Sequence, residues 1–191
     1  IMNQVTRSYL VSTKVISLLD SLTKEDICSI LCSSLDELLS MEDEQNEPDT
    51  IELPSIASLF VTKKSMSTRT YLDRLVKYTQ IEKSSLILAF MLLDKLKASE
   101  KRVIHTSTIL KLLLTACVVS LKYNEDDIFL NSVYAKIGGV NLLTFNEMEV
   151  VFLKLINFSV HLSLKSWKRY LEFIHHIKCD SLLEEETKTE K

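Results

Sequence analysis

The sequence predicts an all-α protein, and three of its features lead to that fold class. Only two glycines and two prolines occur among its 191 residues, too few turn formers for a fold with many strands. Hydrophobic residues make up 46% of the chain, which is enough for a substantial core. Apolar residues also recur at helical spacing along most of the chain. We therefore expect one sizeable helical domain with additional helices at both ends.

Residues 1–40 are predicted to form two flanking helices. The first carries four apolar residues near one stripe: Val5, Tyr9, Ile16 and Leu19. Thr23, with Asp26 three residues later, has the spacing of an N-cap for the second helix. That second helix places five apolar residues on one face: Ile27, Ile30, Leu31, Leu35 and Leu38. Both stripes are typical of helices that lie against a core.

An acidic segment separates these helices from the rest of the chain. Five acidic residues and one proline lie between Met41 and Thr50, without apolar periodicity. Such a composition is typical of a solvated linker. We therefore predict a linker over residues 41–55.

The first three helices of the central domain can be located from their ends. Ser67 precedes one helix, and the next is expected over residues 82–97. The third begins at Thr106 or Thr108 and is apolar on every side until Lys122. A helix of that kind must be surrounded by other helices.

Two further helices complete this domain, which we place at residues 56–160. The fourth is short and is expected to end at Gly138 and Gly139, where the backbone can adopt the left-handed conformation that closes a helix. Thr144, with Glu147 three residues later, forms a capping box for the fifth helix. The sequence thus predicts a unit of five helices.

A last helix is expected to begin at Ser163. It carries apolar residues at helical spacing: Leu164, Trp167, Leu171, Ile174 and Ile177. The residues that follow are mostly acidic, and chain ends of this kind are poorly ordered. We predict a C-terminal helix over residues 161–182 and a frayed tail over residues 183–191.

The charge and hydropathy of the chain argue against two classes of partner. The net charge of −3 and the pI of about 5.9 do not attract polyanions, so we expect no nucleic-acid partner. The longest apolar run, residues 86–93, is well short of the ~20 residues that span a bilayer. No signal peptide is recognisable, and we expect no membrane partner. Because the chain begins with Ile1, we treat it as a fragment or a processed chain.

Neither a metal site nor catalytic chemistry is predicted. His175, His176 and Cys179 lack a fourth ligand, and adjacent histidines point about 100° apart on a helix. No nucleophile motif or phosphate-binding loop occurs, so we expect no catalytic residue, no cofactor and no enzyme activity. The four cysteines do not have the spacing of a disulfide framework, which favours a reducing cytoplasmic or nuclear compartment.

Four short motifs follow one another in the central domain. They are Tyr-Leu-Asp-Arg-Leu-Val-Lys-Tyr at 71–78, Leu-Leu-Asp-Lys-Leu at 92–96, Val-Val-Ser-Leu-Lys-Tyr at 118–123 and Tyr-Ala-Lys-Ile-Gly-Gly-Val at 134–140. In this order and spacing they resemble the cyclin box, and within that family they are most similar to the P/U-type cyclins related to the yeast phosphate-signalling cyclin. The last motif is the most specific to that branch, and its key residues are Tyr134, Ala135, Lys136, Gly138 and Gly139.

The resemblance implies a fold and a function. The fold is a single five-helix cyclin box with additional N-terminal and C-terminal flanking helices. The function is that of a regulatory subunit that binds and activates a cyclin-dependent protein kinase, as cyclins do in cell division. The partner implied is therefore a cyclin-dependent kinase, which would supply the ATP and magnesium sites.

The resemblance also assigns roles to single residues. Lys122 and Glu149 match a lysine and a glutamate with which cyclins contact the kinase. Four more residues are expected in that contact: Tyr123, Leu153, Phe158 and Val160. Arg74 and Asp94 match an arginine and an aspartate that form a buried structural ion pair in the family.

From the residues alone, other interpretations stay open. Leu153 lies outside the apolar stripe of the fifth helix and beside Glu149, which favours either a partner surface or packing under another helix of the same chain. Lys122 can equally be an ordinary helix end, because a cation is favoured there by the helix dipole. For the whole chain, the alternative function is a cyclin-fold adaptor in transcription that activates no kinase.

Overall fold

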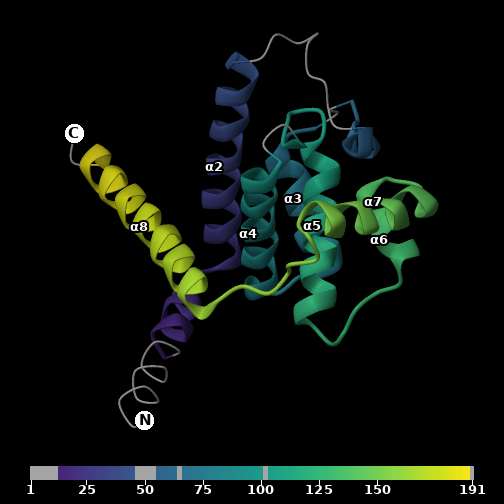
Figure 1. Cartoon of the computed structure of the whole chain (residues 1–191). Coiled ribbons are helices and arrows are strands. Elements are labelled where there is room, and N and C mark those ends of the chain that lie inside the picture. Colours follow the sequence, from purple (N-terminus) through teal and green to yellow (C-terminus); the bar gives the residue numbers. More distant parts are fainter. Residues whose placement is uncertain (1–12, 46–54, 64–65, 101–102, 190–191) are drawn as a thin grey trace. The chain divides into compact units, whose positions relative to one another are not determined.

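The computed structural model describes residues 13–45, 55–63, 66–100 and 103–189. Within these ranges all regular structure is helical, which confirms the all-α prediction (Figure 1). The chain divides into two compact units. One comprises residues 32–160, and the other comprises the described residues up to Leu31 together with those from His161 onward. Val5 and Tyr9 lie outside the described residues.

The start of the second flanking helix is confirmed, whereas the predicted start of the first lies outside the described residues. Residues 13–20 are helical, and α2 (Lys24–Gln45) follows. Thr23 and Asp26 form a reciprocal capping box at its start. The Thr23 N–H donates to Asp26 Oδ2 at 2.8 Å, and the Asp26 N–H donates to Thr23 Oγ1 at 3.0 Å.

The end of α2 differs from the prediction. The helix continues to Gln45, so it runs into the segment that we had placed in a linker starting at residue 41. Glutamate and glutamine are good helix formers even where no apolar stripe guides them. An acidic run without periodicity can therefore extend a helix as a solvated last turn, and the composition argument placed the boundary too early.

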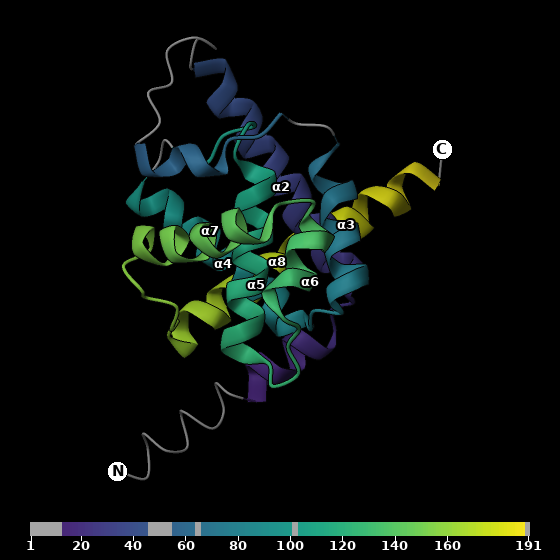
Figure 2. The same cartoon turned by 90° about the vertical axis from the view of Figure 1, so that its right-hand side faces the viewer.

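The unit of residues 32–160 is built around one central helix. Its elements are η1 (Ser55–Phe60), α3 (Thr68–Thr79), α4 (Lys83–Ser99), α5 (Ile109–Asn124), α6 (Asn131–Gly138) and α7 (Leu142–Leu155). Helix α5 contacts η1, α3, α4, α6 and α7. Figure 1 shows α4 beside α5, and in Figure 2 α6 and α7 lie across the front of α5. From Ile109 to Leu121 every residue except Lys111 is buried, which confirms that this apolar helix is surrounded.

Two of the predicted helix ends are confirmed in detail. Ser67 caps α3, because its Oγ accepts a hydrogen bond from the Thr70 N–H at 3.1 Å. Helix α6 ends at Gly139, whose φ is +69°. The Val140 N–H donates to the Ala135 carbonyl oxygen at 2.9 Å and the Gly139 N–H donates to the Lys136 carbonyl at 3.2 Å. This pair of bonds is the Schellman motif that a left-handed residue closes.

The predicted start of α7 is wrong. The N-cap is Asn141, whose Oδ1 accepts a hydrogen bond from the Leu143 N–H at 2.8 Å. Asparagine is among the strongest N-cap residues, and it lies three positions before Thr144. The helix therefore already exists where Thr144 and Glu147 were expected to start it, and these two residues belong to its first turns.

Helix α8 (Leu164–Thr189) belongs to the other unit. It begins directly after Ser163, where the sequence placed its start, and the Ser163 Oγ caps it by accepting a hydrogen bond from the Ser166 N–H at 3.2 Å. The helix continues to Thr189, past the expected end at residue 182, since the glutamates and lysines of the tail are themselves good helix formers. Across the described ranges no helix has both the length and the apolar composition that crossing a membrane requires.

Candidate functional site

An ion pair joins the end of α5 to the middle of α7. Lys122 Nζ donates to Glu149 Oε1 at 2.6 Å. The side chains are 30% and 13% exposed, respectively. The resemblance to cyclins assigned both residues to one partner surface, but it did not predict that they would bind each other. Their pairing depends on the packing of α5 against α7, which helical periodicity does not specify.

Asn131 completes the environment of the Glu149 carboxylate. As the first residue of α6, it donates from Nδ2 to Glu149 Oε2 and to Asn146 Oδ1. Each carboxylate oxygen of Glu149 thus has a hydrogen-bond donor. A largely buried carboxylate needs such partners, because an unpaired charge away from water is costly. The result is a carboxylate on α7 held in one orientation by residues of α5 and α6.

Leu142, which is exposed, and Leu153, which is half-buried, lie on either side of this carboxylate along α7. At about 100° per residue, Leu142, Glu149 and Leu153 fall within roughly 40° of one another around α7. Leu142, Leu143 and Val150 are exposed, and Leu143 reaches 73%. Large exposed apolar groups that gather around a polar group are typical of a protein-binding site. We define the α7 surface as the following residues: Lys122, Leu142, Leu143, Glu149, Val150 and Leu153.

The loop before α6 adds to the exposed apolar area. Ile128, Phe129 and Leu130 are all exposed, with Leu130 at 77%. Because the next residue, Asn131, hydrogen-bonds Glu149, this loop ends beside the ion pair. Sequence reasoning missed these three residues. The available signal was three consecutive apolar residues between the acidic residues of the loop and the start of a helix.

The remaining predicted contact residues lie close to this surface along the chain. Tyr123, next to Lys122, and Phe158, just after α7, are exposed, whereas Leu153 and Val160 are half-buried. Leu153 is therefore partly packed and partly accessible, and its contact with a partner stays a prediction. Its carbonyl accepts a hydrogen bond from the Phe158 N–H at 2.7 Å, which ties Phe158 to the last turns of α7.

The residues of the 134–140 motif have structural roles. Tyr134 and Ala135 are buried, whereas Lys136 is exposed. The Tyr134 hydroxyl accepts a hydrogen bond from the Phe129 N–H at 3.0 Å, and their rings lie 5.9 Å apart. Partial burial raises the pKa of the Tyr134 hydroxyl, against the opposing effect of that hydrogen bond. Tyr134 thus anchors the apolar loop.

Gly138 allows α6 to pack closely against α5. A Cβ atom at Gly138 would overlap the side chain of Leu114 on α5. The Gly138 carbonyl also accepts a hydrogen bond from the Tyr71 hydroxyl at 3.0 Å. Burial raises the pKa of the Tyr71 hydroxyl well above its usual range.

Among the described residues, Arg74 and Asp94 do not lie in the buried setting expected for the family's ion pair. Arg74 Nη2 instead lies 3.4 Å from the carbonyl oxygen of Lys136, and Asp94 is an exposed residue. Helix α3 packs against α5 and α6, which directs Arg74 towards the carboxyl end of α6. The helix dipole makes that end favourable for a cation.

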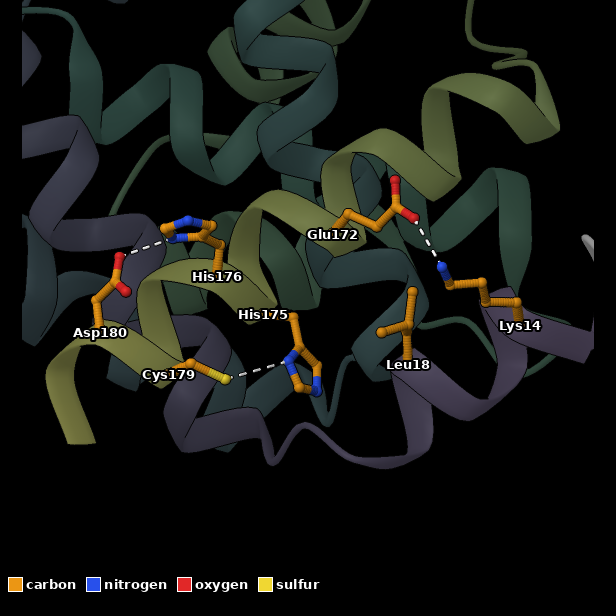
Figure 3. A pocket seen from close by; sticks show the side chains of 7 residues that line it. All are labelled: Lys14, Leu18, Glu172, His175, His176, Cys179 and Asp180. Atoms are coloured by element: carbon orange, nitrogen blue, oxygen red, sulfur yellow. Dashed lines mark hydrogen bonds and ion pairs between the residues drawn. The ribbon is translucent and has the colours of Figure 1, made fainter. Parts of the chain in front are cut away.

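The second unit contains a hollow between residues 13–20 and α8, shown in Figure 3. It is lined by Lys14, Leu18, Glu172, His175, His176, Cys179 and Asp180. His176 and Cys179, the two residues with metal-ligand spacing, have different partners. His176 Nδ1 lies 2.7 Å from Asp180 Oδ2, and Cys179 Sγ lies 3.6 Å from His175 Nδ1. Over the described residues no group of three or more histidine, cysteine or acidic side chains could hold a metal ion.

A helical domain with a charged pair inside an exposed apolar surface is typical of a protein that acts by binding another protein. The family of this protein follows from its sequence. Residues 14–160 match the family model described as Cyclin, and the chain belongs to the cyclin family. The matched range begins at residue 14 and so includes the helices before residue 56. We had predicted that the cyclin box starts at residue 56.

Plant cyclins of the U and P types are similar to this chain. Cyclin-U4-2 of Arabidopsis thaliana is 32% identical over 111 residues, which cover 58% of this chain and 51% of that protein. Cyclin-P3-1 of Oryza sativa subsp. japonica is 26% identical over 105 residues, covering 55% and 44%, respectively. The chain thus spans about half the length of the curated relatives it matches. Cyclins are non-catalytic regulatory subunits, so family membership confirms that the chain is not an enzyme.

Proposed function

We propose that this chain binds a cyclin-dependent protein kinase through the α7 surface and activates it. The observation that carries the proposal is the Lys122–Glu149 pair, held in one geometry on a helix that also exposes Leu142, Leu143 and Val150. The similar plant proteins are named as cyclins, and a kinase partner for this chain is part of the proposal. The protein would act in the cytoplasm or nucleus, in keeping with its free cysteines.

The apolar and charged parts of the surface would contribute differently to the complex. Burying the exposed leucines against the kinase supplies most of the binding free energy. The Glu149 carboxylate and the Lys122 ammonium fix the register, because a charged group buried at an interface must meet a matching polar group. Since Glu149 is already held by Lys122 and Asn131, little conformational entropy is lost on its docking.

The mechanism of activation would be a shift of population. Docking against the regulatory helix of the kinase favours the inward position of that helix, in which the lysine–glutamate pair of the kinase active site is complete. The chain can shift this equilibrium only by binding the inward state more tightly than the outward state. All bond-making chemistry stays in the kinase.

The proposal is tested by mixing the purified chain with each member of a panel of purified cyclin-dependent kinases. Binding is measured by calorimetry, and activation is measured as phosphorylation of a histone substrate. At least one kinase should bind and become active. Binding without activation would favour the alternative, a cyclin-fold adaptor, and no binding across the panel would contradict the proposal.

Variants at the α7 surface sharpen this test. Glu149→Gln keeps an oxygen for Asn131 but removes the charge, and breaking a charge pair at an interface costs roughly 2–5 kcal/mol of binding free energy. Leu143→Asp places an unpaired charge in the apolar contact. Because Leu143 is so exposed, its replacement should leave the melting temperature unchanged. Tyr78→Asp, at an exposed aromatic residue of α3, is the matched control and should bind normally.

A further inference from the structure

The turn after α7 holds two successive residues in the left-handed region. Asn157 and Phe158 both have φ of +53°. The Asn157 N–H donates to the Lys154 carbonyl at 2.9 Å and the Phe158 N–H donates to the Leu153 carbonyl at 2.7 Å. These bonds form a Schellman motif, which explains the left-handed conformation of Asn157.

The Schellman motif does not explain the conformation of Phe158. A bulky side chain at positive φ is rare, because its Cβ crowds the backbone. Burial of the ring does not compensate, since Phe158 is 65% exposed. Strained residues of this kind persist only where the surrounding structure holds them, and they gather at functional sites.

Helix α4 supplies the groups that hold this turn. Lys95 Nζ donates to the Ser159 carbonyl oxygen at 2.7 Å and to Ser159 Oγ at 2.6 Å. One helical turn later, Ser99 Oγ donates to the Leu155 carbonyl oxygen at 3.2 Å. The ammonium group therefore lies beside the carboxyl end of α7, where the helix dipole favours a cation. Hydrogen bonds from a charged donor are stronger than those between neutral groups.

We propose that Lys95 is a positioning residue: by binding Ser159 it locks the turn at 157–158 and keeps the Phe158 ring in solvent, ready for the kinase. The inference rests on the proposed function, because it takes Phe158 as part of the docking surface. Lys95 itself does not have to touch the partner. Its contribution is to remove the entropy that a mobile Phe158 would lose on binding.

Backbone hydrogen exchange tests the positioning role without any partner. Lys95→Met keeps the aliphatic stem and removes the charged donor. We expect the Phe158 and Ser159 amides to exchange about tenfold faster in this variant, with the amides of α5 unchanged, because a local opening exposes only local hydrogen bonds. Lys95→Arg should restore the slow exchange. Lys165→Met, at an exposed lysine of α8, is the control and should change neither. Unchanged exchange in Lys95→Met would overturn the proposal.

Binding tests whether the locked turn matters for docking. The probe is the kinase of the panel that the unmodified chain binds most tightly. Lys95→Met and Phe158→Ala should each weaken binding about tenfold, and the double variant should bind no worse than Phe158→Ala alone, since coupled residues are non-additive. Fully additive losses would show that Lys95 acts independently of Phe158 and would overturn the proposal.

Two further outcomes can be told apart. If Lys95→Met lowers the melting temperature strongly, the exchange and binding measurements are repeated with Ser159→Ala in its place. Ser159→Ala removes only the Oγ acceptor of Lys95, and the results expected for it are those given above for Lys95→Met. If no kinase of the panel binds the unmodified chain, the proposed function fails. Exchange at Phe158 then still decides whether Lys95 holds the turn.

Discussion

Gly138 and Gly139 are neighbours in the sequence, but different physical constraints act on them. Gly139 has a left-handed backbone and open space where a side chain would lie. For Gly138 the constraint is steric, because a Cβ would overlap the buried Leu114. The 134–140 motif therefore needs a residue that tolerates positive φ at position 139 and a residue without a Cβ at position 138. Substitutions at each position can measure the two requirements separately.

Gly138→Ala should destabilise the chain by about 1–3 kcal/mol through overpacking, partly offset by the better helix propensity of alanine, up to ~1 kcal/mol. Pairing it with Leu114→Ala should cost less than the sum of the two single changes, because the smaller neighbour accommodates the new methyl group. Gly139→Asn should be nearly neutral, since asparagine tolerates positive φ. Urea unfolding of each variant measures these differences. A strictly additive double variant would contradict the steric explanation.

At the scale of elements, the structure differs from the sequence prediction mainly at the ends of helices. Thr23 with Asp26, and Ser67, were recognisable as caps because each precedes an apolar stripe directly. Asn141 was missed, since a second capping pattern lies three residues later, and the acidic end of α2 was assigned to a linker. Local periodicity indicates that a helix exists, but the hydrogen bonds of its first and last turns fix its ends.

Asn141 provides a direct test at this scale. Asn141→Ala removes the acceptor for the Leu143 N–H and should lower the free energy of unfolding by about 1 kcal/mol. Thr144→Val, inside the helix, should have a smaller effect, because no cap is lost. Thermal melting of both variants gives the comparison. A larger loss of stability for Thr144→Val than for Asn141→Ala would instead support the predicted capping box at Thr144 and Glu147.

Asp26 links the start of α2 to α8 within one unit. Its Oδ2 accepts a hydrogen bond from Lys178 Nζ at 2.6 Å. Partial desolvation acts to raise the pKa of Asp26, but the hydrogen bonds from Lys178 and Thr23 and the charge of Lys178 outweigh it, so the pKa is lowered. A carboxyl group with a lowered pKa stabilises the fold above its unfolded-state pKa of about 3.9. That stabilisation is lost as the pH falls through the folded-state pKa.

Asp26→Asn should therefore reduce the acid sensitivity of the chain. The amide keeps an oxygen for the Thr23 N–H, so the capping box is preserved, while the charge is removed. We expect the variant to be less stable than the unmodified chain at pH 7, with the difference shrinking towards pH 3. Urea unfolding at a series of pH values measures this, with Asp20→Asn at an exposed position as control. If the difference in unfolding free energy between Asp26→Asn and the unmodified chain were the same at every pH, the charge of Asp26 would not be its cause.

At the scale of the whole molecule, the sequence predicted the fold class and the order of the helices, because both follow from apolar periodicity and turn residues. Contacts between helices were harder to predict. Lys122 and Glu149 lie 27 positions apart and meet, whereas Arg74 has the Lys136 carbonyl as its partner in place of Asp94. The register between two helices depends on side-chain packing over their whole contact, and no single motif encodes it.

The footprint of a bound kinase tests the docking surface as a whole. If the α7 surface and the apolar loop before α6 form the contact, kinase binding should slow amide exchange at residues 126–130 and from α7 through Val160, because an interface excludes water from exposed backbone. The turns of α3 around Tyr78 should exchange as in the free chain. Protection at α3 without protection at α7 would place the contact elsewhere. Since an adaptor could dock through the same residues, the same sample should also be assayed for histone phosphorylation. Protection at the α7 surface together with a rise in kinase activity is the outcome that the proposed function requires.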